Sequence, residues 1–207
     1  MLQSLRIRKA RRQPRHHELI RSLAPDPAAY PDTIDANFEN WVRMWVDLRP
    51  AAQSDCGKIV ALRGVSWEGQ RLWLIRHTDK RFGFHAIAPT PQDAITQAIA
   101  AWEERRRVRR HWPTVRRIAR DLALGRRRME VRLEDAHASA LCTVGIEGFM
   151  QRTGLGRYKR VSGRTAALMM LLEPQVGFVI LAAHERLNGR LPDNPSPPNR
   201  DRGLRLA

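Results

Sequence analysis

The 207-residue chain has little cysteine and no segment that resembles a secretory signal. Its two cysteines, Cys56 and Cys142, lie 86 positions apart, and neither has a partner at the spacing of a metal site or a redox motif. The basic residues 1–17 lack the apolar run that a signal peptide requires. We therefore expect no disulfide framework and no export, and we expect the protein in a reducing compartment, the cytoplasm.

The chain also has no uninterrupted apolar run of membrane-spanning length. The most apolar stretch, residues 165–183, carries Glu173, Pro174 and Gln175 at its middle. A charge and a helix break are both costly at the centre of a bilayer. We therefore expect no membrane span and interpret this stretch as core or as a contact between protomers.

Catalytic signatures are missing as well. The seven histidines are scattered, without an H-E-x-x-H helix, a paired-cysteine ligand set or a nucleophile elbow. The cluster Glu134, Asp135 and His137 could supply two carboxylates and an imidazole, but acidic residues there also suit a helix N-terminus. We predict no catalytic activity, no cofactor and no metal site. A hydrolase or nuclease that uses this cluster is the third hypothesis.

The chain does have a large excess of positive charge, +16 overall, and almost all its basic residues are arginine. Residues 1–22 carry a net charge of +6 and residues 103–128 a net charge of +8. A nearly neutral body with two basic segments favours a polyanionic partner, nucleic acid before an acidic protein or a membrane. The candidate phosphate contacts in the two segments are Arg8, Arg11, Arg12, Arg105, Arg106, Arg109 and Arg110.

The apolar periodicity predicts an α+β fold. Residues 35–48 have the spacing of an amphipathic helix, with Pro50 just beyond its end. Residues 58–68, 71–78 and 81–88 are typical of three short strands, and their short connections predict a three-stranded antiparallel meander. A helix that Thr90 caps and Pro91 begins should pack on this sheet and continue outward as a charged extension.

The remaining periodic segments predict only helices, at residues 114–124, 143–153, 162–172 and 174–188. The expected organisation is a basic N-terminal arm (1–34), a helix with the three-stranded sheet and further helices (35–128), a helical C-terminal part (129–189) and a flexible tail (190–207).

Four short motifs lie in order within residues 61–103: RGVSW at 63–67, WLIR at 73–76, RFG at 81–83 and the helical segment DAITQA at 93–98. This segment resembles the plant ethylene-response-factor (APETALA-type) DNA-binding domain and its relatives in phage-like homing endonucleases and integrases. The resemblance implies a small sheet that lies in the major groove of DNA, with a helix packed on the sheet. It implies that Arg63, Arg76 and Arg81 contact bases and phosphates.

The first hypothesis is a non-catalytic nucleic-acid-binding protein of bacterial or phage-derived origin, with DNA favoured over RNA. The second is an interaction or assembly adaptor that forms a homodimer or binds a protein partner through the apolar residues 162–188. A shared positive face that contains Arg63, Arg76 and Arg81 would favour the first hypothesis. Scattering of these arginines, or their pairing with acids, would favour the second.

Overall fold

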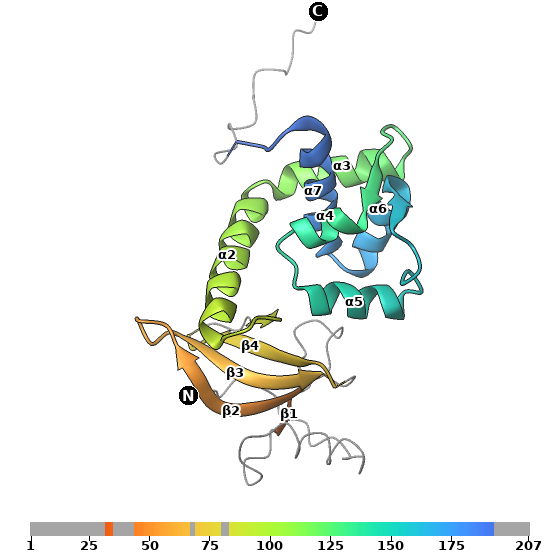
Figure 1. The fold of residues 1–207 in the computed structure, drawn as a ribbon. Coiled ribbons are helices and arrows are strands. Elements are labelled where there is room, and N and C mark those ends of the chain that lie inside the picture. The colour runs from red at the N-terminus through yellow and green to blue at the C-terminus, as the bar shows by residue number, and fades with distance from the viewer. Residues whose placement is uncertain (1–31, 35–43, 67–68, 80–82, 193–207) are drawn as a thin grey trace, which may run out of the picture. The chain divides into compact units, whose positions relative to one another are not determined.

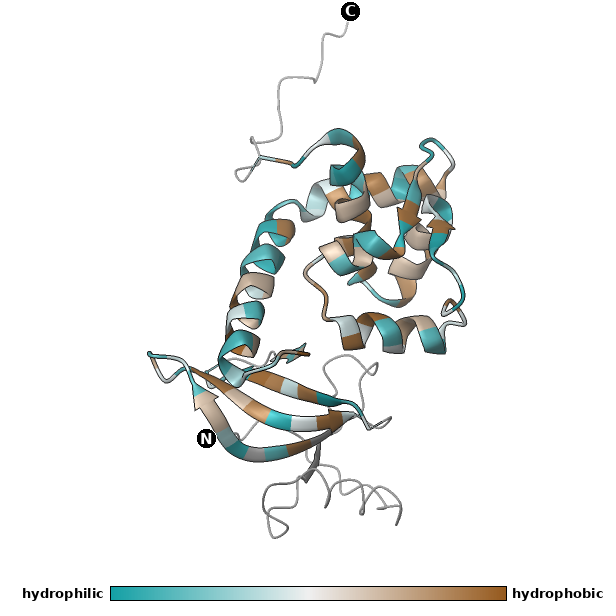
Figure 2. Cartoon of the chain, in the orientation of Figure 1, coloured by the Kyte–Doolittle hydropathy of each residue, from teal (hydrophilic) through white to brown (hydrophobic). Residues whose placement is uncertain are grey.

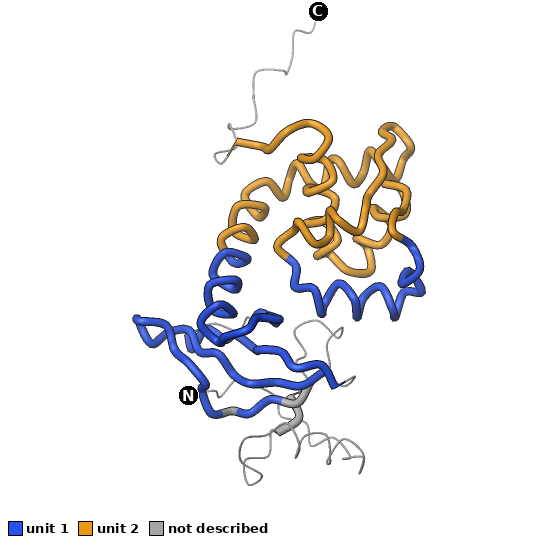
Figure 3. The backbone as a smooth tube through the Cα atoms, in the orientation of Figure 1, with its two compact units in different colours: residues 1–102, 141–158 blue, residues 103–140, 159–207 orange. Residues whose placement is uncertain are grey.

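The computed structural model describes residues 32–34, 44–66, 69–79 and 83–192. An antiparallel sheet is followed by helices, which confirms the predicted α+β class (Figure 1). The chain forms two compact units (Figure 3): unit 1 contains residues 1–102 and 141–158, and unit 2 contains residues 103–140 and 159–207. The chain changes from one unit to the other after residue 102, inside a helix, and again after residues 140 and 158. None of these points is residue 128, where the sequence predicts a boundary.

Unit 1 is built on a five-stranded sheet in which each strand is antiparallel to the next. The strands follow the chain order: β1 (Asp32–Ile34), β2 (Met44–Gln53), β3 (Ile59–Ser66), β4 (Arg71–His77) and β5 (Gly83–Ala86). The predicted meander corresponds to β3, β4 and β5, and β1 and β2 extend it on one side. Figure 2 shows hydrophobic residues along the central strands.

The helix predicted for residues 35–48 is wrong from Met44 onward, because these residues belong to β2. Residues 44–46 pair with residues 64–66 of β3, so their backbone groups bond across the sheet instead of along a helix. Pro50 lies where the β2–β3 register is irregular, and its missing N–H is tolerated there. Residues 35–43 lie outside the described part of the chain.

Both faces of the sheet are buried in unit 1. The chain becomes helical directly after Thr90, and this helix, α2 (Pro91–Arg110), covers one face. Thr90 caps α2 as predicted, because its Oγ1 accepts the Asp93 N–H at 3.1 Å. The cluster under α2 includes Ile59, Ala61, Ile75, Phe84, Ala94, Ile95, Ala98 and Trp102. The cluster on the opposite face contains Val46, Val60, Leu62, Leu72, Leu74 and, from α5 (Thr143–Arg152), Val144.

Unit 2 packs helices around a buried C-terminal helix. Its further elements are α3 (Trp112–Ala123), β6 (Glu130–Arg132), α4 (Leu133–Ala138), β7 (Arg160–Ser162), α6 (Gly163–Leu172) and α7 (Val176–Asn188). The expectation of helices alone is wrong for β6 and β7, which pair antiparallel. Strands of three residues are too short for periodicity to reveal. Within the described residues, no helix has both the length and the apolar character to cross a membrane.

Gly163 permits a close contact between three elements of unit 2. Its N–H donates to the Met129 carbonyl oxygen at 2.7 Å. A Cβ atom at this position would lie 2.7 Å from Leu122 Cδ2 and 2.8 Å from the Met129 oxygen. Because one neighbour is the backbone oxygen that accepts this hydrogen bond, the chain at Met129 cannot move away without loss of the bond. The start of α6 is thus fixed against the end of α3 and the start of β6.

Arg107, near the end of α2, joins α2 to α7 through two carboxylates. Its guanidinium donates to Glu104 at 2.6 Å and to Glu185 at 2.7 Å, and its side chain is only 6% exposed. The hydrogen bonds to Glu104 and then to Glu185 raise the pKa of Arg107. Burial alone would raise the pKa of Glu185, but hydrogen bonds from Arg107 and from the Leu191 N–H outweigh it, so the pKa lies below its ordinary value of 4.5.

We predict that Gly163→Ala lowers the stability of unit 2 by about 1–3 kcal/mol, although alanine is the better helix former. The reason is overlap of the new methyl group with Leu122 and with the Met129 carbonyl. Thermal and denaturant unfolding followed by circular dichroism would measure the change. Gly156→Ala is the matched control, because no atom lies within 4 Å of the position that its new methyl group would take. Equal stability of the two variants would contradict the prediction.

We also predict that Glu185→Gln lowers stability by about 1–3 kcal/mol near pH 7, because Arg107 loses one of its two charged partners. The folded-state pKa of Glu185 is depressed, so its contribution is complete above the ordinary pKa of 4.5 and is lost as pH falls through the folded-state pKa. The difference between wild type and variant should therefore shrink below about pH 4.5 in denaturant titrations.

The exposed pair of Glu103 and Arg106, 3.6 Å apart, provides the control. Glu103→Gln should change stability by less than about 0.5 kcal/mol. A constant difference between wild type and Glu185→Gln across the acid range would show that the carboxylate charge is not the cause.

Candidate nucleic-acid interface

The positive charge is divided unevenly between the two units. Among the described residues, unit 1 has seven basic and six acidic side chains, a net charge of +1. Unit 2 has seventeen basic and eight acidic side chains in its described part, a net charge of +9. A polyanion is therefore attracted to the helical unit more strongly than to the described part of the sheet unit.

α3 has an apolar face and an arginine face. Val115, Ile118 and Leu122 are buried in unit 2. The side chains of Arg116, Arg117 and Arg120 are exposed on the other side of the helix, and none forms an ion pair with a described residue. Like charges three or four residues apart on a helix destabilise it by about 0.2–0.5 kcal/mol per pair. We call these three residues the α3 arginine face.

Further exposed basic residues flank the contact at Gly163. Arg126 and Arg128 lie in the segment that joins α3 to β6, and Arg164 lies in the first turn of α6. The hydrogen bond from the Gly163 N–H to the Met129 oxygen brings the chain at Arg128 and the chain at Arg164 together. These arginines also lack an ion pair within the described residues, so unit 2 presents positive charge from α3, from this segment and from α6.

The predicted arginines of the second basic segment have different environments. Arg105 is half-buried, and its Nε donates to the Ala140 carbonyl oxygen at 3.0 Å. Arg106 is exposed and pairs with Glu103. Arg109 and Arg110 are exposed at the end of α2 and have no ion pair within the described part of the chain. Arg109 and Arg110 are therefore the members of the predicted set that are most accessible to a ligand.

The predicted arginines of the sheet do not form one surface. Arg63 is exposed and is paired in register with Trp73, on the face that α2 covers. Arg76 is paired with Val60 on the opposite face and is only 2% exposed. Burial lowers the pKa of Arg76. A side chain so deeply buried cannot contact a phosphate in this conformation. Arg81 and the arm residues Arg8, Arg11 and Arg12 lie outside the described residues.

Asp135 in the acidic cluster has a structural role. It accepts the Arg132 N–H at 2.8 Å at the start of α4 and pairs with Arg186 of α7 at 2.7 Å. Glu134 and His137 are both exposed. The described residues contain no group of three histidine, cysteine, aspartate or glutamate side chains that could hold a metal ion.

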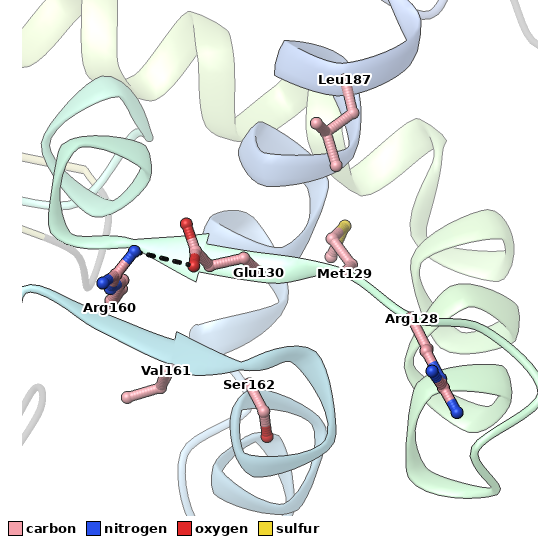
Figure 4. A pocket seen from close by; sticks show the side chains of 7 residues that line it. All are labelled: Arg128, Met129, Glu130, Arg160, Val161, Ser162 and Leu187. Carbon is pink, nitrogen blue, oxygen red and sulfur yellow. Dashed lines mark ion pairs between the residues drawn. The ribbon is translucent and has the colours of Figure 1, made fainter.

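A hollow of about 640 Å³ lies beside the β6–β7 ribbon in unit 2 (Figure 4). Its lining comes from three separate segments: Arg128, Met129, Glu130, Arg160, Val161, Ser162 and Leu187. Sequence reasoning missed this site, because the pairing of two three-residue strands creates it and no local motif marks it. Of the residues that line the hollow, only Arg128 belongs to a feature that the sequence shows, the basic segment 103–128.

Comparison of the chain with protein-family models, with curated proteins and with solved structures finds no match. The candidate interface is therefore defined by the charge, exposure and packing of this chain's own residues.

Proposed function

We propose that the protein binds nucleic acid, DNA before RNA, and that it does so without catalysing a reaction. The observation that carries the proposal is the α3 arginine face, exposed and without acidic partners among the described residues, in a unit whose described part has a net charge of +9. The guanidinium group suits phosphate because it presents several N–H donors in a fixed plane.

The spacing of the α3 arginine face suits a repeating polyanion. Arg116 and Arg120 are one helical turn apart, about 6 Å along the axis. A nucleic-acid strand carries one phosphate charge per roughly 3.4 Å of duplex axis, so the two side chains can reach different phosphates. Arg109, Arg110 and Arg128 can add contacts as the strand extends. Arg63 and Arg76 do not share a face, and this observation on the sheet favours the second hypothesis. The charge of unit 2 is what supports the first, so we place the interface in unit 2 and not on the sheet.

A second candidate function is self-association or binding of a protein through residues 162–188. Much of that segment is core, since Ile180 and Leu181 of α7 are fully buried. The outer face of α6 is different: Leu168, Leu171 and Leu172 are all exposed, Leu171 to 79%. Three neighbouring exposed leucines favour an apolar contact, and α6 is the part of the predicted segment that could make it.

We predict that binding of a fluorescent oligonucleotide by the full chain weakens steeply between roughly 50 and 200 mM salt. The variant Arg116→Ala/Arg117→Ala/Arg120→Ala should bind about tenfold more weakly at the low salt concentration. It should also reduce the slope of log affinity against log salt by about 2 to 3, because each lost phosphate contact releases fewer counterions. Fluorescence anisotropy titrations at several salt concentrations measure both quantities.

Arg63→Ala/Arg71→Ala is the control, because both residues are exposed arginines of the sheet unit. It should retain wild-type affinity. Loss of affinity in this variant alone would move the interface to the sheet, as the family resemblance implies. Absence of binding by the wild-type chain at about 50 mM salt or below, with folding confirmed by circular dichroism, would refute the proposed function.

The second candidate predicts that the wild-type chain sediments as a dimer at micromolar concentration and that Leu168→Glu/Leu171→Glu sediments as a monomer. The physical reason is that burial of a carboxylate in an apolar contact is unfavourable. Leu124→Glu is the matched control, since Leu124 is an exposed leucine at the end of α3. A monomeric wild-type chain would leave this candidate without support.

A further inference from the structure

The hollow beside the β6–β7 ribbon combines an apolar surface with charged ends. In Figure 4, Arg160 and Arg128 lie at opposite ends, and Met129 and Glu130 lie between them. Leu187 extends from α7 toward Met129. Met129 is buried and forms the bottom of the hollow. Leu187 is 54% exposed, so a ligand can reach its side chain.

The charges around the hollow leave net positive potential for a ligand. Arg128 has no ion pair among the described residues. Arg160 is exposed and lies 3.5 Å from Glu130, while Arg132 donates to the same carboxylate at 2.9 Å. Glu130 is therefore held in place between two arginines, and its carboxylate remains about two-fifths exposed as an acceptor of N–H groups. Arg128 and Arg160 can attract the negative groups of a ligand, and the Glu130 carboxylate between them can accept hydrogen bonds from it. This arrangement suits an anionic ligand that also carries hydrogen-bond donors.

The size and polarity of the hollow select among anionic ligands. A volume of about 640 Å³ lies within the range of small-molecule sites. An inorganic phosphate would use the arginines but not the apolar surface of Met129 and Leu187. A nucleotide uses both, because its base has an apolar face, its edge can donate to a carboxylate, and its phosphates are anionic. A base-paired nucleotide has its faces stacked and its edge occupied, so only an unpaired one can place its base there.

We propose that this hollow binds one unpaired nucleotide, with the base against Met129 and Leu187 and the flanking phosphates at Arg128 and Arg160. This inference rests on the proposed nucleic-acid function and specifies its ligand as a strand with unpaired bases. The α3 arginine face holds phosphates of the same strand. The nucleotide could belong to a polynucleotide or be free, and the chemistry of recognition is the same for both.

The test compares four probes with the full chain at about 50 mM salt: a short labelled single strand, its duplex, an abasic strand of equal length and a free mononucleotide as competitor. Electrostatics alone favours the duplex, because its charge density is the higher. We expect the reverse, about tenfold tighter binding of the single strand than of the duplex or the abasic strand. Competition by the mononucleotide would show that a free nucleotide also enters the hollow; without it, the site requires a strand.

Two substitutions with matched controls locate the site. Leu187→Ser should abolish the preference for the single strand and leave duplex affinity unchanged, whereas Leu124→Ser, at an exposed leucine outside the hollow, should alter neither. Arg128→Ala should weaken single-strand binding about fivefold more than Arg126→Ala, the neighbouring exposed arginine. These are surface positions, and unchanged thermal unfolding will show that the variants are folded.

The outcomes separate this inference from the proposed function. Equal affinity for the single strand, the duplex and the abasic strand, with no effect of Leu187→Ser, overturns the nucleotide site and leaves the proposed function intact. Binding of none of the probes at low salt overturns both. Preference for the single strand that survives Leu187→Ser and Arg128→Ala places base recognition elsewhere and overturns the assignment to this hollow.

Discussion

The contact of Arg107 with Glu104 and Glu185 is the interaction on which unit 2 depends. The C-terminal end of α2 is rich in arginine, and Arg107 is the one whose side chain is buried there. Its guanidinium donates hydrogen bonds to two carboxylates, and one of them, Glu185, comes from α7. A buried guanidinium with one partner removed is strongly unfavourable, so the contact determines where the end of α2 can lie on α7. α3 begins two residues after α2 ends, and its position follows from the same contact.

Four carboxylates of unit 2 are engaged in contacts that do not involve the α3 arginine face. Glu104 and Glu185 hold Arg107, Asp135 holds Arg186, and Glu130 holds Arg132. Each of these carboxylates thus serves a contact that supports the fold, and none shields the α3 arginine face. Mutual repulsion of uncompensated arginines opposes folding, and a bound polyanion removes that repulsion. Ligand binding and stability of unit 2 should therefore be linked.

Local signals in the sequence were sufficient for some elements and insufficient for others. The cap at Thr90 and the short turns of the meander depend on a few neighbouring residues. The start of α2 and the antiparallel order of β3, β4 and β5 were therefore predictable. β2 was misjudged because pairing with β3 overrode the helical spacing of its apolar residues. The arginine face of α3 follows from the positions of its buried residues. The hollow could not be predicted, since Gly163 and the pairing of β6 with β7 bring its segments together.

The chain passes between the two units three times, at residues 102, 140 and 158. During synthesis, the sheet is complete before its last helix, α5, has been made, and α3 and α4 emerge before the central helix α7 of their own unit. Unit 2 therefore cannot bury its core until α7 has left the ribosome. No single cut releases either unit intact, so loss of the C-terminal segment would expose the apolar surfaces of α3, α4 and α6 together.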